Sequence, residues 1–425
     1  MLKKRLFPLV VVLSIALVAA IGLAFWQYQE AQASGLAVRT GRERAYYSAL
    51  DALTSLEADL SKALIASAPG QHALLLGRVS TLAATASENL SALPAAYGAD
   101  ASGLKFLNQT SDYAQTLAAA AAEGRTLTQD DVNQLSELLE KGGELRRHLE
   151  SGAGFTYDET AAGENLSGIE YPTLLYDGPF SDGIRSGQAL GLSGEEISAE
   201  QALAIAKDFL GASHTQRAAD MQGPIPCWGV SAQLADITVT LQLTRQGGKV
   251  LWMAPETAGF TASLDAAACM ERAKSFLQSH GFGEMQASYY QQYDGLCVVS
   301  FAAVQDNVLL YPDLVKVQVR MDTGDIVGLE ANNYWTNHTV RENLTPALSA
   351  EEAQRFVSGR LTVEGSRLCV IPVDDGMNTG VTEKLCWEFS GTWSSSRYLV
   401  YIDAQTGAEE QVLKVVTGND GTLTM

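Results

Sequence analysis

The feature that most constrains the fold of this chain is a unit of one helix followed by paired strands, of which the second half of the sequence contains three copies. Ile197-Ser-Ala-Glu-Gln-Ala and Leu348-Ser-Ala-Glu-Glu-Ala align without a gap, and the copy between them begins at Leu264. Each opens a helix-like stretch, and each is followed by runs rich in β-branched and aromatic residues. Recurrence of one supersecondary unit predicts an α+β fold in which each helix packs on an antiparallel sheet.

Local signals mark where the elements of these copies begin and end. In the first copy we expect Ser198 to cap the helix, Gly211 to stop it, and Gln246-Gly247-Gly248 to join two strands as a hairpin. Asp265 is the expected cap of the second helix, and the third helix-like stretch runs from Leu348 to Leu361. The three copies are predicted to span residues 169–260, 261–340 and 341–425.

Apolar residues at three- and four-residue steps dominate the region before the copies. The first stripe comprises Leu50, Leu53, Leu56, Leu60 and Leu64. Three more stripes follow, and the last opens at Thr128 with Asp131 in place of the usual Glu of a capping box. Amphipathic helices with short connections predict an antiparallel bundle over residues 31–150, and the small polar residues 151–168 predict a linker.

The N-terminal residues predict a membrane anchor. Lys3, Lys4 and Arg5 precede an uncharged run from Leu6 to Trp26, which is long enough to cross a hydrocarbon core of about 30 Å as a helix. The basic cluster predicts a cytoplasmic N-terminus, with the rest of the chain outside, and residues 1–30 form the expected single-pass anchor. The alternative is a cleaved signal peptide with its cleavage site in Ala31 to Ser34.

Charge and motifs narrow the classes of function. The formal charge of −20 disfavours nucleic acid, whose phosphates would repel this surface. The chain has no CxxC, HExxH, GxSxG or phosphate-loop motif. We therefore predict no catalytic, cofactor-binding or metal-ligating residues and no enzymatic activity, and we expect the five histidines at the surface.

The five cysteines leave two interpretations open. They are Cys227, Cys269, Cys297, Cys369 and Cys386. Because the number is odd, at least one thiol stays free unless it pairs between chains. Cys369 and Cys386 flank a hairpin-like segment and could form a disulfide, while the alternative is that all five are small buried apolar residues.

The stretch from Tyr171 to Ile184, YPTLLYDGPFSDGI, joins the helical region to the first copy. As a partner or ligand loop it would use Tyr176 and Phe180 as anchors, and Asp177 and Asp182 as polar contacts. As architecture it would be a strand that breaks at Asp177-Gly178-Pro179, with Phe180 in a core and a second turn after it. Both interpretations stay open at this point.

The copies resemble PepSY domains, in which a helix packs on an antiparallel sheet. The residues that carry this resemblance are SAEQALAIAKDFLG (198–211) and the turns DTGDI (322–326) and DAQTGAEE (403–410). The order of basic start, anchor, helical region, YDGPFSD block (176–182) and PepSY-like copies resembles the YpeB family of spore germination proteins. This resemblance covers essentially the whole chain, and the YDGPFSD block is its most specific part.

The resemblance implies a role and a location. It implies a non-enzymatic protein of the spore inner membrane, with its body on the outer side, that stabilises, localises or restrains the cortex-lytic enzyme SleB for breakdown of cortex peptidoglycan. Two alternatives remain: an envelope enzyme such as a peptidoglycan hydrolase or peptidase, and a protease inhibitor of the PepSY type. The sequence does not decide whether the chain forms a homo-oligomer.

Overall fold

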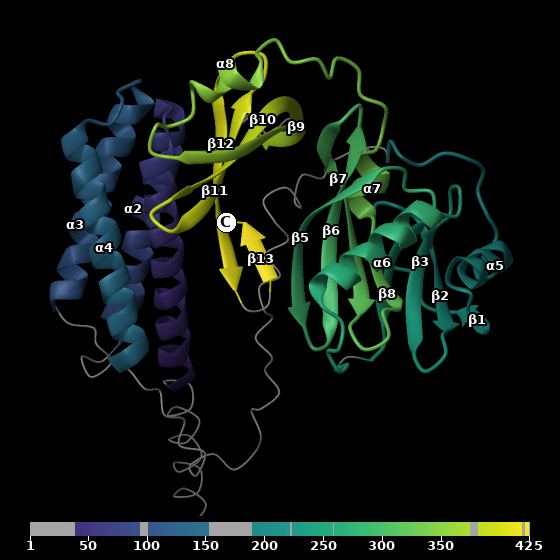
Figure 1. Ribbon diagram of the computed structural model, residues 1–425. Helices are drawn as coiled ribbons and strands as arrows, with labels where there is room; N and C mark the ends of the chain where they lie inside the picture. The colour runs from purple at the N-terminus through teal and green to yellow at the C-terminus, as the bar shows by residue number, and fades with distance from the viewer. Residues whose placement is uncertain are drawn as a thin grey trace, which may run out of the picture. The chain divides into compact units, whose positions relative to one another are not determined.

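The computed structural model describes residues 39–93, 101–152, 189–221, 223–257, 259–374, 381–418 and 421–424. The chain divides into two compact units (Figure 1): a helical unit, Met1–Leu64 with His72–Ala162, and a sheet unit, Ile65–Gln71 with Gly163–Met425. The expected anchor, Leu6 to Trp26, lies outside the described residues and stays a prediction. No helix in the described ranges combines the length and the hydropathy needed to cross a bilayer.

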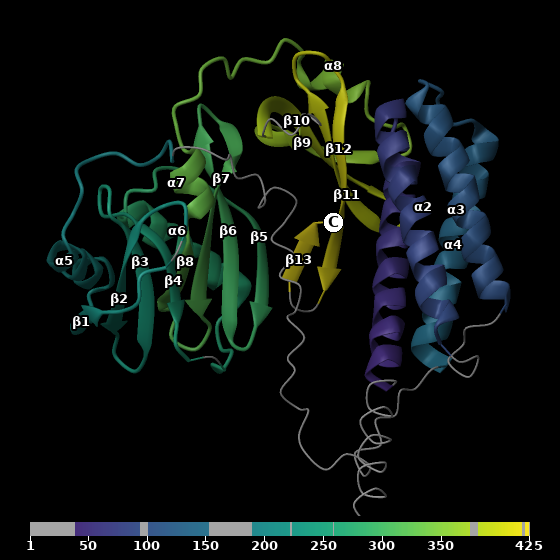
Figure 2. The ribbon, with the colours of Figure 1, turned by 180° about the vertical axis from the view of Figure 1, so that it is seen from behind.

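The described part of the helical unit is a bundle whose helices run side by side in Figures 1 and 2. Its helices are one over residues 39–65, α2 (Pro69–Ser91), α3 (Ala101–Ala122) and α4 (Gln129–Gly152). Leu53, Leu56, Leu60 and Leu64 are completely buried, whereas Leu50 is half-buried. The predicted leucine stripe is therefore core, because a 3.6-residue period keeps these side chains on one face.

The N-terminus of α4 has the predicted cap. The backbone N–H and the hydroxyl of Thr128 both donate to Oδ2 of Asp131, at 2.8 and 2.7 Å, and the N–H of Asp131 donates back to Oγ1 of Thr128 at 3.2 Å. This reciprocal exchange satisfies helix donors that would otherwise lack acceptors. The shorter Asp thus performs the role of the usual Glu, as the sequence indicated.

The sheet unit contains three consecutive copies of a helix followed by four strands. The first copy consists of α5 (Ala199–Leu210), β1 (His214–Arg217), β2 (Cys227–Gln233), β3 (Thr238–Thr244) and β4 (Val250–Pro255). The second consists of α6 (Ala266–Ser279), β5 (Met285–Tyr293), β6 (Leu296–Gln305), β7 (Val308–Arg320) and β8 (Ile326–Glu330), followed by α7 (Asn332–Asn337). The third consists of α8 (Ala350–Gln354), β9 (Thr362–Asp374), β10 (Val381–Trp393), β11 (Ser396–Asp403) and β12 (Glu409–Gly418), followed by β13 (Gly421–Thr424).

All thirteen described strands belong to one hydrogen-bonded sheet in the order β1-β2-β3-β4-β8-β7-β6-β5-β13-β12-β11-β10-β9. Each copy contributes an antiparallel meander of four strands. The first and second copies join where β4 pairs with β8, at Met253 opposite Leu329. An additional parallel pairing connects β7 with β9.

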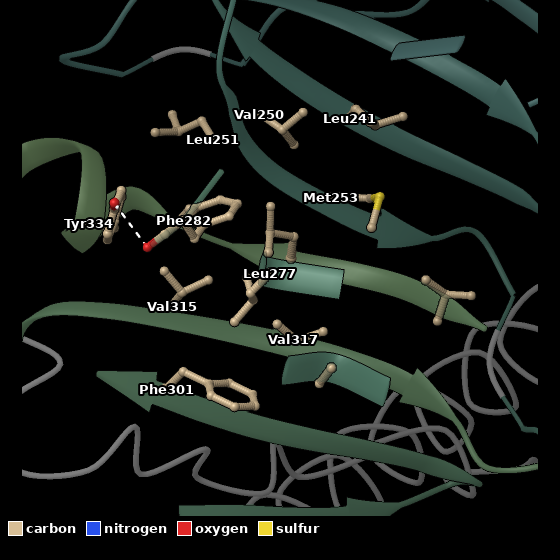
Figure 3. Close-up of a cluster of buried hydrophobic side chains, with 14 of the residues drawn as sticks. Leu241, Val250, Leu251, Met253, Leu277, Phe282, Phe301, Val315, Val317 and Tyr334 are labelled. Carbon is tan, nitrogen blue, oxygen red and sulfur yellow. Dashed lines mark hydrogen bonds between the residues drawn. The ribbon is translucent and has the colours of Figure 1, made fainter. Parts of the chain in front are cut away.

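One face of the first two copies carries the main core (Figure 3). Cross-strand partners point to the same side of a sheet, and Leu241, Met253, Leu329, Val317 and Val299 are successive partners across five strands. All five are buried in one cluster with the inner faces of α5 and α6. The two helices therefore cover the same face of a continuous sheet.

The predicted N-caps of the first two helices and the predicted stop of the first are confirmed, but the third helix is shorter than expected. Ser198 forms a capping box at α5, Gly211 ends that helix in the left-handed region, and Asp265 caps α6. The expected helix from Leu348 to Leu361 is wrong beyond Gln354. After that residue the backbone bonds reach back three positions instead of four, so the chain continues in tight turns.

Candidate functional site: a polar pocket in a ring of strands

The pairing of the second and third copies closes a ring of eight strands, β5–β7 and β9–β13, called here the strand ring. It closes on one side through β13 and β5, with Gly421 opposite Gln291. On the other side Leu309 and Leu310 of β7 lie opposite Cys369 and Val370 of β9. Figure 1 shows β13 beside β5 at the first of these contacts.

The inward-facing residues of the strand ring are apolar toward one end. They form a buried cluster of Ala302, Leu309, Tyr311, Leu314, Cys369, Ile371, Cys386, Tyr401 and Leu413. These residues come from six strands of the ring, so they meet inside it. Cys369 and Cys386 are direct cross-strand partners in this cluster, and the next inward pair along the two strands is Arg367 and Glu388.

Three polar groups lie at the edge of this apolar cluster. The Tyr311 hydroxyl donates to Oε2 of Glu388 at 2.5 Å, and Nε of Arg367 donates to Oε1 at 2.7 Å. Nη2 of Arg367 also donates to the Tyr311 oxygen at 2.8 Å. Both carboxylate oxygens of Glu388, which is only 3% exposed, therefore have a donor, as a buried charge requires.

A bulge in β7 positions Tyr311. The partner of Ala302 is Leu314, but the partner of the next residue, Ala303, is Leu310, so the three residues between them leave the regular ladder. The middle one, Pro312, has no N–H to donate, which suits it to a bulge. Burial is the main cause that raises the pKa of Tyr311 well above its usual value, and the negative charge of Glu388 is the second. The hydroxyl therefore keeps its proton and donates.

A pocket of about 360 Å³ lies beside these groups. Its lining comes from strands β5, β9, β10, β11 and β12, and consists of Ser288, Tyr289, Gly365, Ser366, Arg367, Glu388, Ser390, Arg397, Leu399 and Val415. The registers place Gly365 and Leu399 on either side of Ser390. The pocket is thus the polar continuation of the apolar interior of the strand ring.

Two arginines and one glutamate give this lining a positive balance. Burial by itself lowers the pKa of Arg367, but the adjoining Tyr311 and Glu388 raise it on balance, so the guanidinium is charged. Arg397 is 56% exposed, and its only acidic neighbour among the described residues is Glu364, at 3.4 Å. Glu388 alone carries a negative charge into the lining, and Arg367 already neutralises it.

A second buried ion cluster lies between β7 and β10, on the segment that leads from α7 into the third copy. Arg341 donates from Nη1 and Nη2 to the two oxygens of Asp313, each at 2.6 Å, and from Nη2 to Glu383 at 3.0 Å. His338 contacts Asp313 through Nδ1 at 2.7 Å and stacks on Tyr334. The arrangement holds a His–Asp pair, but among the described residues the His338 ring has no hydrogen bond to a serine or cysteine, so we assign the pair a structural role.

The cysteines are buried free thiols, which confirms the apolar interpretation and not the disulfide between Cys369 and Cys386. These two are register partners, and the Cys369 thiol approaches the carbonyl of Cys386 at 3.5 Å. Burial raises the pKa of Cys227 to about 11 and that of Cys297 to about 12. A protonated buried thiol is a poor nucleophile at neutral pH.

Over the described residues, no group of three or more His, Cys, Asp or Glu side chains is placed to hold a metal ion. The expectation of surface histidines is wrong for His72, which is 3% exposed. It shares the buried face of α2 with Leu75, Leu76 and Val79, three, four and seven residues further on, so helical periodicity directs it inward.

The four residues proposed from the sequence, Tyr176, Asp177, Phe180 and Asp182, lie outside the described residues, so their role stays a prediction. The pocket residues were missed by sequence reasoning, although a signal existed. Arg367 precedes Cys369 and Ile371 at two-residue steps, and Glu388 follows Cys386 in the same way. A charge on the apolar face of a strand indicates an inward polar group, but only long-range pairing shows that the two meet.

Two family models match the chain one after the other. The model described as YpeB N-terminal matches residues 30–154, and the model described as YpeB sporulation, PepSY1 and PepSY2 domains matches residues 164–344. Residues 345–425, which contain the third copy, lie beyond both ranges.

Similar proteins cover nearly the whole chain. Sporulation protein YpeB of Halalkalibacterium halodurans is 25% identical over 442 residues, which is 95% of this chain and 97% of that protein. The protein of the same name from Oceanobacillus iheyensis is 25% identical and covers 94% of this chain and 95% of its own length. The solved Bacillus megaterium YpeB C-terminal domain is 26% identical, with a TM-score of 0.46, over 52% of this chain and 99% of that one.

Proposed function

We propose, from the premise that this chain belongs to the YpeB family of sporulation proteins, that it is a non-enzymatic interaction protein of spore germination. Its proposed task is to stabilise, localise or restrain the cortex-lytic enzyme SleB for the breakdown of cortex peptidoglycan. The observation that carries the proposal is the match of both YpeB family models, in order, together with similarity over nearly the full length of two sporulation proteins.

Binding rather than catalysis is supported by the chemistry of the described residues. The thiols are buried and protonated, and the His338–Asp313 pair is engaged by Arg341. PepSY domains, which match the first two copies, are helix-and-sheet modules and not typical catalytic domains. The formal charge of −20 further favours a protein partner over nucleic acid.

The proposed location is the spore inner membrane, with the anchor at Leu6 to Trp26 and the body on the outer side. The support is the uncharged run behind a basic cluster. Fractionation of dormant spores should place the chain in the inner membrane, and added protease should digest the body only from the outer side. A soluble chain that lacks its first residues would instead indicate the cleaved signal peptide.

The decisive test of the proposed function is the level of SleB in dormant spores that lack this chain. We expect SleB to be depleted and cortex breakdown to fail, and both to recover when the full chain is restored. The matched comparison is a chain without residues 6–26, which should restore neither if anchoring matters. Normal SleB levels in the deletion strain would contradict the proposal.

The block at 176–182 gives a second test, which separates its two interpretations. Asp177→Asn together with Asp182→Asn keeps size and removes two charges. If the block contacts the partner, SleB should co-purify less with a chain that still accumulates normally. If the block is architectural, the level of the chain itself should fall.

The enzymatic alternative predicts a different result. Purified full-length chain, incubated with cortex fragments in the absence of SleB, should release no soluble muropeptides if the protein only binds. Release of such fragments would identify an envelope hydrolase instead. A panel of extracellular proteases tests the remaining alternative, because inhibition at equimolar chain would identify a PepSY-type inhibitor.

A further inference from the structure

We infer that the pocket of the strand ring binds a small ligand through an oxyanion group, a carboxylate or a phosphate, held between Arg367 and Arg397. The inference concerns a site that the proposed partnership with SleB does not use. It rests on the charges of the lining, on unused hydrogen-bond donors and on the size of the pocket.

The charge balance of the pocket opposes that of the whole protein. The chain carries a formal charge of −20, yet this lining has two guanidinium groups and one carboxylate. Glu388 has one oxygen bonded to Arg367 and the other to Tyr311, so its negative charge is already paired with a cation of the protein. The remaining charge that faces the pocket is positive, which favours an anion.

Donors in the pocket are available for such an anion. Arg367 donates through Nε and Nη2, and the structure gives its Nη1 no acceptor among the described residues. Its position is fixed by Glu388 and Tyr311, so a ligand that takes this N–H meets a preorganised group. A guanidinium presents its N–H groups in a fork that matches the oxygens of a carboxylate or phosphate.

Arg397 supplies the second cation from β11, on the same inner face. Its register partner on β12 is Val415, and both line the pocket. Its one acidic neighbour in the described chain, Glu364, is 3.4 Å away and itself 42% exposed. An ion pair this exposed to water contributes little to stability. A ligand oxyanion can therefore replace Glu364 beside Arg397 with only a small loss of free energy.

The dimensions of the pocket limit the ligand to a small molecule. A volume of about 360 Å³ lies at the lower end of the range of roughly 300–1,000 Å³ that is usual for small-molecule sites. The walls near the arginines are small or hydroxyl-bearing, at Gly365, Ser366 and Ser390. Ser366 and Ser390 can donate further hydrogen bonds to oxygen atoms of the ligand, while Leu399 offers one apolar contact.

The test is isothermal titration calorimetry of the full chain with acetate, succinate and inorganic phosphate as probes. We expect one saturable site for at least one probe, and the tighter class of probe identifies the group as carboxylate or phosphate. Arg397→Gln removes an exposed charge and should weaken binding about tenfold or more, the loss expected for one charge-assisted pair. Arg355→Gln, an equal loss of charge at an exposed position outside the pocket lining, should leave the affinity unchanged.

Two further variants guard against effects of folding. Glu364→Gln removes the acid that competes for Arg397, so binding should tighten, a gain that misfolding does not produce. Gly365→Leu fills the pocket without a change of charge and should abolish binding while the thermal midpoint is retained. Absence of saturable binding for all three probes, or equal weakening by Arg355→Gln and Arg397→Gln, would overturn the inference.

Discussion

Arg341 and Asp313 form a bidentate ion pair in which the carboxylate is completely buried and the arginine side chain is 8% exposed. Asp313 belongs to the bulge in β7 of the second copy, and Arg341 lies on the segment that leads into the third. Arg341 also bonds to Glu383 of β10. The pair thus ties the two copies together at a point that backbone pairing does not reach.

Replacing this arginine should strongly destabilise the sheet unit. Arg341→Met leaves Asp313 charged, buried and without its main donor, and the expected loss is about 3–5 kcal/mol in the free energy of unfolding. The measurement is urea unfolding followed by tryptophan fluorescence, because every tryptophan among the described residues lies in the sheet unit. Lys274→Met, at an exposed site on α6, should change it by less than about 0.5 kcal/mol.

A double variant sharpens this prediction. Asp313→Asn together with Arg341→Met removes both charges, so its cost should be smaller than the sum of the two single costs. Additive costs would show that the two residues act independently, which would contradict the role given to the pair.

The buried thiols predict that stability falls at alkaline pH. Burial, and to a smaller extent the neighbouring Cys269, raises the pKa of Cys297 to about 12. A cysteine in an unfolded chain has a pKa of about 8.5. Between these values the unfolded chain has released the proton and the folded chain has kept it. The contribution of the protonated Cys297 thiol to the free energy of unfolding is therefore complete below a pH of about 8.5. As the pH rises toward 12, this contribution falls by about 1.4 kcal/mol per pH unit.

Urea unfolding at pH 7, 8.5 and 10 measures this dependence. Cys297→Ala removes one ionisable group and should make the decline above pH 8.5 less steep, although it lowers stability at pH 7 by removing a buried side chain. An unchanged slope in the variant would exclude Cys297 as a source of the dependence.

Two glycines with the same backbone angle should respond differently to substitution. Gly283 and Gly295 both have φ of +72°, but a Cβ at Gly283 meets nothing within 4 Å, whereas one at Gly295 would lie 1.9 Å from the carbonyl oxygen of Phe260. Gly283→Ala should cost about 1 kcal/mol from the left-handed conformation alone. Gly295→Ala should cost at least about 2 kcal/mol more, because backbone must move. Equal midpoints in urea would show that Phe260 moves away freely.

The cap of α4 should contribute measurably to the helical unit. Thr128→Ala removes the hydroxyl that donates to Asp131 and accepts its N–H, and the expected loss is about 1 kcal/mol. Circular dichroism at a helical wavelength follows the transition. Thr116→Ala is the matched control, because that exposed hydroxyl bonds only within α3, and it should have little effect. A comparable loss in both variants would assign the effect to helix propensity and not to the cap.

The parts of the fold that depend on near neighbours were predictable from the sequence. Ser198 and Gly211 mark the ends of α5 because capping and a left-handed stop are local events. The strand ring was not predictable, since it needs Gln291 to meet Gly421 and Leu309 to meet Cys369. Those pairings connect different copies, and the alternation of apolar and polar residues along a strand does not show which strand of another copy it meets.

The candidate site was missed for the same reason. Arg367 and Glu388 are register partners within one hairpin, so their pairing was open to prediction. Their burial beneath Tyr311 depends on a bulge in another copy, which no local pattern indicated. Chemistry that is assembled from two copies of a repeat does not leave a motif in either copy.

Closure of the strand ring also bears on aggregation. A long strand at the open edge of a sheet can recruit a strand from another molecule, because its main-chain donors and acceptors are unpaired. In the described sheet β5 has β13 on its outer side and β9 contacts β7, while the other terminal strand, β1, has only four residues and carries Arg217. Ring closure and a short charged edge thus limit strand exchange between neighbouring copies of this acidic protein.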